Sequence, residues 1–109
     1  MYDAIVVGGG HNGLTASAYL GKAGKKVLVL ERRHLVGGAA VTEEFHPGYR
    51  NSMASYVVSL LRPEIVRDLE LERHGYRTIP LNSTFGPMLD GRYSLLTGDE
   101  ENDRREIGK

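Results

Sequence analysis

The sequence of 109 residues contains no cysteine and no excess of charge of either sign. Without cysteine, structural disulfides and thiolate metal sites are excluded, although the cellular compartment is left open. Lys plus Arg and Asp plus Glu number 14 each, and the pI is about 6.9. No basic stripe stands out, so we expect no nucleic-acid partner.

Long hydrophobic runs and targeting patterns are also missing. No apolar run approaches the roughly 20 residues that a membrane span needs. Residues 1–30 lack the charged start and apolar centre of a secretory signal, so we expect a cytoplasmic protein. Contact with a membrane surface cannot be read from this sequence. The four histidines match no metal motif, and no metal site is expected.

What the sequence does contain is a glycine-rich loop between two short apolar runs. The run at 4–7 leads into G-x-G-x-x-G at 8–13, a helix-like stretch follows to residue 23, and the run at 27–30 ends at Glu31. Strand, glycines, helix, strand and acid in this order are typical of a dinucleotide site. The pattern therefore predicts an α/β fold that starts with the β-α-β unit of a Rossmann-like domain.

Each glycine of the motif has a physical role. Gly8 allows a tight turn, Gly10 lets the backbone approach a pyrophosphate, and Gly13 lets the helix pack against the sheet. The helix also points its free N–H groups and positive dipole end at the phosphates. His11 and Asn12 lie in the same loop and are candidate cofactor contacts. A glycine-rich turn in an α/β unit without a ligand is the alternative interpretation.

Glu31 is the candidate ribose-binding residue. Its carboxylate can accept hydrogen bonds from both hydroxyls of an adenosine ribose, and its charge repels a 2′-phosphate. This argues against NADP. The loop and the acid do not distinguish a nicotinamide dinucleotide from a flavin dinucleotide. Further along the helix, Ser17 and Gly21 are small enough for close packing.

The segment after Glu31 resembles that of FAD-binding oxidoreductases, in which an acid is followed by a glycine pair. In that family the pair lies beside the dinucleotide and leads toward the flavin. The resemblance implies Arg32, Gly37, Gly38 and Ala39 as further cofactor-binding residues. Glycine at these positions lets the backbone run close to a cofactor. An ordinary turn is the alternative for the glycine pair.

Residues 2–93 resemble, more narrowly, the phytoene-dehydrogenase-like FAD oxidoreductases, relatives of carotenoid desaturases and flavin amine oxidases. Amine oxidases usually carry Arg after the glycine pair, where this chain has Ala39, and this difference favours the phytoene-dehydrogenase-like branch. The motifs that carry the resemblance lie at 8–14, 30–32, 37–43, 46–49, 61–65, 68–69, 71, 74–75 and 90–92.

The resemblance implies an FAD-dependent oxidoreductase that desaturates or oxidises an apolar small-molecule substrate. The flavin performs hydride or electron transfer, while the protein holds and tunes it. No catalytic acid or base can be named from these residues. An NAD-linked dehydrogenase and a non-catalytic module that binds an adenine dinucleotide are the alternatives.

Family members are several times longer, so the sequence resembles an N-terminal fragment with an incomplete fold. We expect a partial FAD-binding domain at 1–75, and at 76–109 a β-hairpin from the start of a substrate domain with a charged tail. A doubly wound sheet needs more than the two strands legible here. Uncovered strand edges favour self-association, and the fragment alone is expected to be inactive.

Local patterns predict the elements after residue 40. A turn-rich stretch is followed by a short helix, one strand, a hairpin around Asp90-Gly91, and an exposed, mobile tail. The expected ranges, in the same order, are 41–58, 63–72, 76–81, 85–97 and 98–109.

Overall fold

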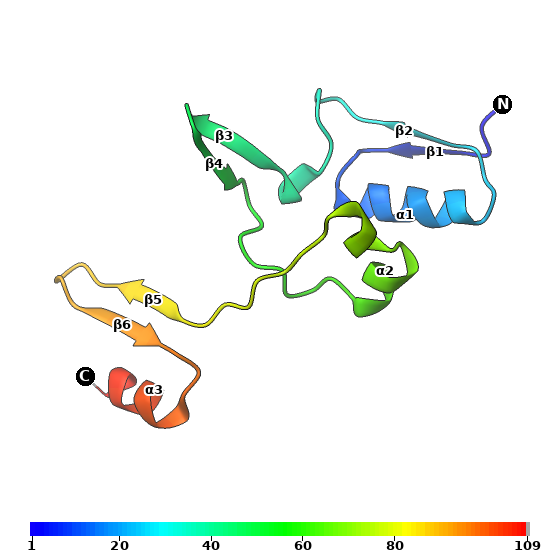
Figure 1. The fold of residues 1–109 in the computed structure, drawn as a ribbon. Coiled ribbons are helices and arrows are strands. Elements are labelled where there is room, and N and C mark those ends of the chain that lie inside the picture. The colour runs from blue at the N-terminus through cyan, green and yellow to red at the C-terminus, as the bar shows by residue number, and fades with distance from the viewer. Residues whose placement is uncertain (109) are drawn as a thin grey trace. The chain divides into compact units, whose positions relative to one another are not determined.

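The computed structural model describes residues 1–108, which divide into two compact units. The first unit comprises Met1–Tyr76 and the second begins at Arg77. Helices and strands carry the labels of Figure 1.

The first unit begins with the β-α-β arrangement that the sequence predicted. Strands β1 (Ala4–Val7) and β2 (Val27–Leu30) pair in parallel, with Ala4 opposite Val27 and Val7 opposite Leu30. Helix α1 (His11–Lys22) connects them and lies along the strand pair, as Figure 1 shows. The helix ends one residue before the expected position, and Gly24 follows in a left-handed conformation. The α/β fold class is confirmed.

Helix α1 approaches β1 most closely at Gly13. A Cβ atom at this position would lie 2.2 Å from the carbonyl oxygen of Gly8 and 3.3 Å from the Cγ1 atom of Val6. Gly13 therefore permits the close packing that the motif predicted. Ser17, one turn later, donates a hydrogen bond to the Gly13 carbonyl oxygen (2.7 Å). The same expectation for Gly21 was wrong, because Gly21 is exposed and a Cβ there would meet no atom within 4 Å.

The remainder of the first unit contains a hairpin that the sequence did not predict. After the short helix η1 (Gly38–Ala40), β3 (Thr42–His46) and β4 (Tyr49–Ser52) pair in antiparallel fashion, with an irregularity after Glu44. The Glu44 carboxylate accepts a hydrogen bond from the N–H of Gly48 in the turn (2.7 Å). Polar residues dominate both strands, so the alternation that marks a half-buried strand is absent.

The helix expected at 63–72 is broken into two pieces. Helix α2 (Pro63–Asp68) stops at a left-handed Glu70 (φ 50°), and a 3-10 helix, η2 (Leu71–His74), follows. Asp68 connects α2 to α1. Its carboxylate accepts a hydrogen bond from the Tyr19 hydroxyl (3.0 Å), and its carbonyl oxygen accepts one from the Lys22 ammonium.

The second unit contains the predicted hairpin but not the preceding strand. Strands β5 (Thr84–Pro87) and β6 (Tyr93–Leu96) pair in antiparallel fashion, and Gly91 (φ 84°) lies in the turn between them. The strand expected at 76–81 was wrong: this segment has no regular structure. Pro80 lacks the N–H group that a central strand would donate.

The charged tail was wrongly expected to be mobile, since it forms helix α3 (Glu100–Ile107). Asp99 caps the helix by accepting a hydrogen bond from the N–H of Asn102 (2.8 Å). Two ion pairs at i,i+4 spacing join Glu100 to Arg104 and Glu101 to Arg105. Such caps and pairs stabilise a polar helix. The last position of the expected tail, 109, lies outside the described residues.

Gly13→Ala is expected to destabilise the folded chain by about 1–3 kcal/mol, the usual range for overpacking, because the new methyl group meets the Gly8 carbonyl. Gly21→Ala is the matched control on the same helix. Its methyl group enters open space, so we expect a gain of about 0.5–1 kcal/mol from helix propensity. Urea unfolding followed by circular dichroism measures both. Equal effects of the two substitutions would contradict the close approach at Gly13.

We propose that the 109-residue chain self-associates through the exposed side of β1. Ile5 is 60% and Val7 is 84% exposed, and Val41 is the only buried hydrophobic residue in the part of the chain that the structure describes. Uncovered apolar strands promote association. Light scattering should show oligomers that dissociate in an Ile5→Thr, Val7→Thr double variant. Ile79→Thr, at a position 83% exposed but outside any strand, should leave them intact. A monomeric parent chain at high concentration would refute the proposal.

Candidate dinucleotide site

The candidate site is built where β1 ends and α1 begins. Gly8 turns the chain with a φ of 104°, and its N–H donates to the carbonyl oxygen of Leu30 at the end of β2 (2.8 Å). Gly10 is the N-cap residue of α1 and provides no side-chain cap, and no acidic residue lies in the first turn of the helix. The N–H groups and the positive end of the helix dipole are therefore available to an anion such as a pyrophosphate.

The glycine pair at 37–38 packs directly against this loop. Gly37 donates a hydrogen bond to the carbonyl oxygen of Gly9 (2.7 Å), and a parallel β-bridge pairs it with Gly10. A Cβ atom on Gly38 would lie 2.9 Å from the Cα atom of Gly10, so only glycine fits this approach without movement. Two glycine segments that are far apart in the sequence thus form one surface of bare backbone.

Glu31 is joined to the loop by hydrogen bonds from the backbone. Its Oε2 accepts from the N–H of Gly9 (2.7 Å), and its Oε1 accepts from the N–H of Arg33 (2.9 Å). These bonds, that from Arg33 first and that from Gly9 second, hold the pKa of Glu31 below its usual range, and partial desolvation opposes them. A carboxylate has about four lone-pair positions, so it can still accept hydrogen bonds from a ribose.

The other predicted contacts lie around this centre. Arg32 is exposed and adds to the positive charge that lowers the pKa of Glu31. His11 and Asn12 are exposed in the first turn of α1, and Ala39 is exposed in η1. The structure thus brings the predicted glycines and Glu31 together and places these four residues at the edge of the same region. Their contact with a cofactor stays a prediction.

Three residues that the sequence analysis did not name take part in the site. Gly9 is buried and supplies both the N–H that Glu31 accepts from and the carbonyl that Gly37 donates to. The guanidinium of Arg33 forms an ion pair with Glu43 on β3 (2.7 Å). The G-G-G run contained a signal for Gly9, whereas nothing in the sequence links Arg33 to a position ten residues later.

Two kinds of site were also sought across residues 1–108. No group of three or more His, Cys, Asp or Glu side chains is placed to hold a metal ion in this range. Within the same residues, no helix is long and apolar enough to cross a membrane.

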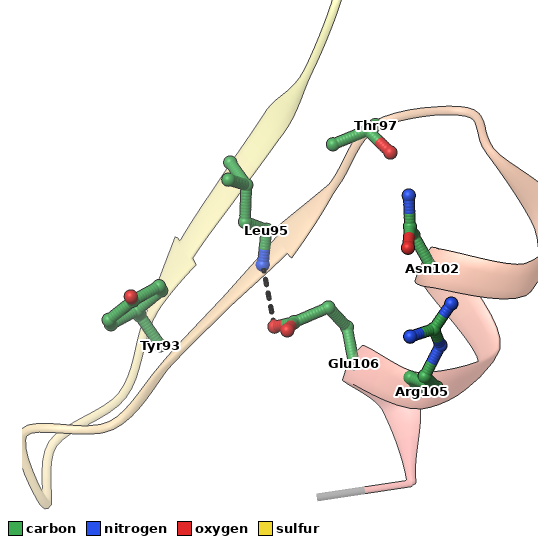
Figure 2. Close-up of a pocket in the computed structure, with 6 residues that line it drawn as sticks. All are labelled: Tyr93, Leu95, Thr97, Asn102, Arg105 and Glu106. Atoms are coloured by element: carbon green, nitrogen blue, oxygen red, sulfur yellow. Dashed lines mark hydrogen bonds between the residues drawn. The ribbon is translucent and has the colours of Figure 1, made fainter.

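A cavity of about 430 Å³ lies in the second unit, between β6 and α3. Figure 2 shows Leu95 on β6 facing Glu106 on α3, whose carboxylate accepts a hydrogen bond from the Leu95 N–H (3.4 Å). All of its lining residues except Glu106 are exposed. A hollow so open to water lacks the burial that orients a small ligand. The remaining lining residues are Tyr93, Thr97, Asn102 and Arg105.

Comparison with known proteins identifies the first unit. The family model for an NAD(P)-binding Rossmann-like domain matches residues 6–69, which is more than half of the chain. This range contains the glycine loop, Glu31 and the glycine pair. The predicted dinucleotide-binding domain is therefore confirmed.

Several curated proteins are similar to the chain over most of its length. Pyridine nucleotide-disulfide oxidoreductase domain-containing protein 2 of Rattus norvegicus is 57% identical over 90 residues, which cover 82% of this chain and 16% of that protein. A limonene dehydrogenase polypeptide of Castellaniella defragrans is 55% identical, with 67% and 13% covered. The (S)-6-hydroxynicotine oxidase of Paenarthrobacter nicotinovorans is 44% identical, with 72% and 19% covered. The chain thus spans less than a fifth of each relative, and all three carry the name of an oxidoreductase or of its domain.

The lowered pKa of Glu31 predicts a pH-dependent contribution to stability. Because the pKa is lower in the folded than in the unfolded chain, the ionised carboxylate stabilises the fold above the ordinary value of 4.5. This contribution is lost as the pH falls through the lowered pKa. Glu31→Gln should therefore destabilise the chain at neutral pH, and the difference from the parent should shrink in acid.

Urea unfolding at several pH values from neutral to acid measures this difference. Glu72→Gln, at an exposed position outside the site, controls for the loss of one carboxylate. A difference between Glu31→Gln and the parent that stays constant with pH would show that the ionised form does not hold the loop.

Proposed function

The chain belongs to the NAD(P)-binding Rossmann-like domain family, and from this premise we propose that it is the dinucleotide-binding part of an FAD-dependent oxidoreductase. The proposal extends to the phytoene-dehydrogenase-like group, with a partial FAD-binding domain at 1–75 and the start of a substrate domain at 76–109. The whole protein, rather than this chain alone, would carry the activity.

The packing of the glycine pair on the phosphate loop is the observation that carries the choice of FAD. The general dinucleotide motif needs only the first loop, the helix and the acid. Here Gly37 and Gly38 continue the bare backbone surface beyond Gly10, with a Cβ on Gly38 only 2.9 Å from the Gly10 Cα atom. Such a continued surface suits a dinucleotide that runs along both segments, as the resemblance to FAD oxidoreductases implies.

The residues of the chain fit the binding half of this cofactor. The N-terminus of α1 would bind the pyrophosphate, and Glu31 would accept hydrogen bonds from the adenosine ribose. When bound, the flavin supplies acceptance of a hydride or of electrons. No residue of the chain is assigned to proton transfer.

The names of the relatives support the proposed substrate class. One is a dehydrogenase of limonene and another an oxidase of (S)-6-hydroxynicotine, and both names describe oxidation of a small molecule. We propose that the full-length protein desaturates or oxidises an apolar small molecule. The chain itself has no cysteine, so these residues carry no disulfide chemistry.

An NAD-linked dehydrogenase is the second candidate, and the description of the matching family as NAD(P)-binding favours it. The two candidates differ in a direct way. A flavoprotein retains a yellow chromophore on purification, whereas a nicotinamide cofactor absorbs mainly at shorter wavelength.

The absorbance of the purified full-length protein between about 350 and 500 nm therefore tests the proposal. We expect flavin bands in the parent and their loss in Gly10→Val, whose branched side chain enters the pyrophosphate position. Gly21→Val, on the exposed side of the same helix, should keep them. A colourless parent protein that binds NAD would favour the second candidate. A normal flavin content in Gly10→Val would remove the loop from the site.

A further inference from the structure

We propose that Glu43 is a positioning residue that sets the specificity of the dinucleotide site. By holding the Arg33 guanidinium on β3, it withholds a positive charge from any 2′-phosphate on the adenosine ribose. The inference rests on the proposed dinucleotide-binding function and names what that site rejects.

The backbone places Arg33 beside the ribose-binding acid. The N–H of Arg33 donates to Oε1 of Glu31, while Oε2 of Glu31 accepts from Gly9 in the phosphate loop. The Cα atom of Arg33 is thus tied to the carboxylate that defines the ribose position. In dinucleotide folds that accept a 2′-phosphate, an arginine near this point pairs with it.

The side chain of Arg33, however, is paired with another residue. Its Nη2 atom donates to both carboxylate oxygens of Glu43, at 2.7 and 2.8 Å. Glu43 is fixed in turn, because it lies in β3 opposite Asn51 of β4. The hairpin that the sequence did not predict therefore determines where the Arg33 charge lies.

Exposure shows what this ion pair does and does not contribute. The side chains of Arg33 and Glu43 are 43% and 28% exposed, and ion pairs so open to solvent add little to folding stability. The effect of the pair is instead to neutralise Arg33 locally. Glu31 then repels a 2′-phosphate without an opposing partner from Arg33, and Arg32, the neighbouring cation, already lies in the field of Glu31.

The test compares two ligands that differ only in the 2′-phosphate, ADP-ribose and 2′-phospho-ADP-ribose. Calorimetric titration of the full-length protein, freed of bound cofactor, gives both dissociation constants and their ratio. The parent should prefer ADP-ribose. Glu43→Gln should reduce this preference roughly tenfold, since a released Arg33 can form a charged hydrogen bond with the 2′-phosphate.

Matched variants separate this effect from simpler ones. Glu44→Gln removes the same charge from the same strand without touching Arg33, because Glu44 bonds the N–H of Gly48, so the ratio should stay unchanged. Arg33→Ala alone should also leave the ratio unchanged, because its charge is already withheld. Combining Arg33→Ala with Glu43→Gln should restore the preference of the parent.

The outcomes distinguish this inference from the proposed function. ADP-ribose binding with a ratio that Glu43→Gln does not alter, or that Glu44→Gln alters equally, overturns the role of Glu43 alone. An equal loss of both ligands in Glu43→Gln and Arg33→Ala assigns the pair to folding of the site and also overturns it. A parent protein that binds neither ligand nor FAD refutes the proposed function, and the inference fails with it.

Discussion

The close approach of α1 to β1 at Gly13 is the constraint on which the first unit depends. A methyl group at this position would lie 2.2 Å from the Gly8 carbonyl oxygen, so any other residue would push the helix away from the strand. With the helix in place, Gly10 becomes its N-cap and the glycine loop adopts its turn. The pairing of β1 with β2 then brings Gly9 within hydrogen-bond distance of Glu31.

Glu31 shows how one carboxylate can serve both the fold and the site. The loop has no side chains with which to fix itself, and the Glu31 oxygens accept N–H groups from the two segments on either side of the ribose position. The same bonds keep the carboxylate ionised, because they lower its pKa. Its charge is then available for recognising hydroxyls and rejecting a 2′-phosphate, with the Arg33 charge held by Glu43.

The agreement between sequence and structure follows the range of the interactions involved. The hairpin at Asp90-Gly91 was predicted because its turn chemistry is local, and Gly91 has the required positive φ. The helix at 100–107 carried local signals too, in the Asp99 cap and the spaced ion pairs, but the high charge of the segment suggested a mobile tail. The break at Glu70 was missed because the apolar spacing continues past it.

The sequence by itself determined the β-α-β unit, the position of the glycine loop and the acid at the end of β2, since these follow from short-range spacing and from what glycine alone permits. Tertiary structure decided the packing of Gly38 on Gly10, the bond from Gly9 to Glu31 and the ion pair between Arg33 and Glu43. Each of these contacts joins segments that meet only after the strands have paired. Local propensity carries no information about such a meeting, because it depends on how the chain folds back in space.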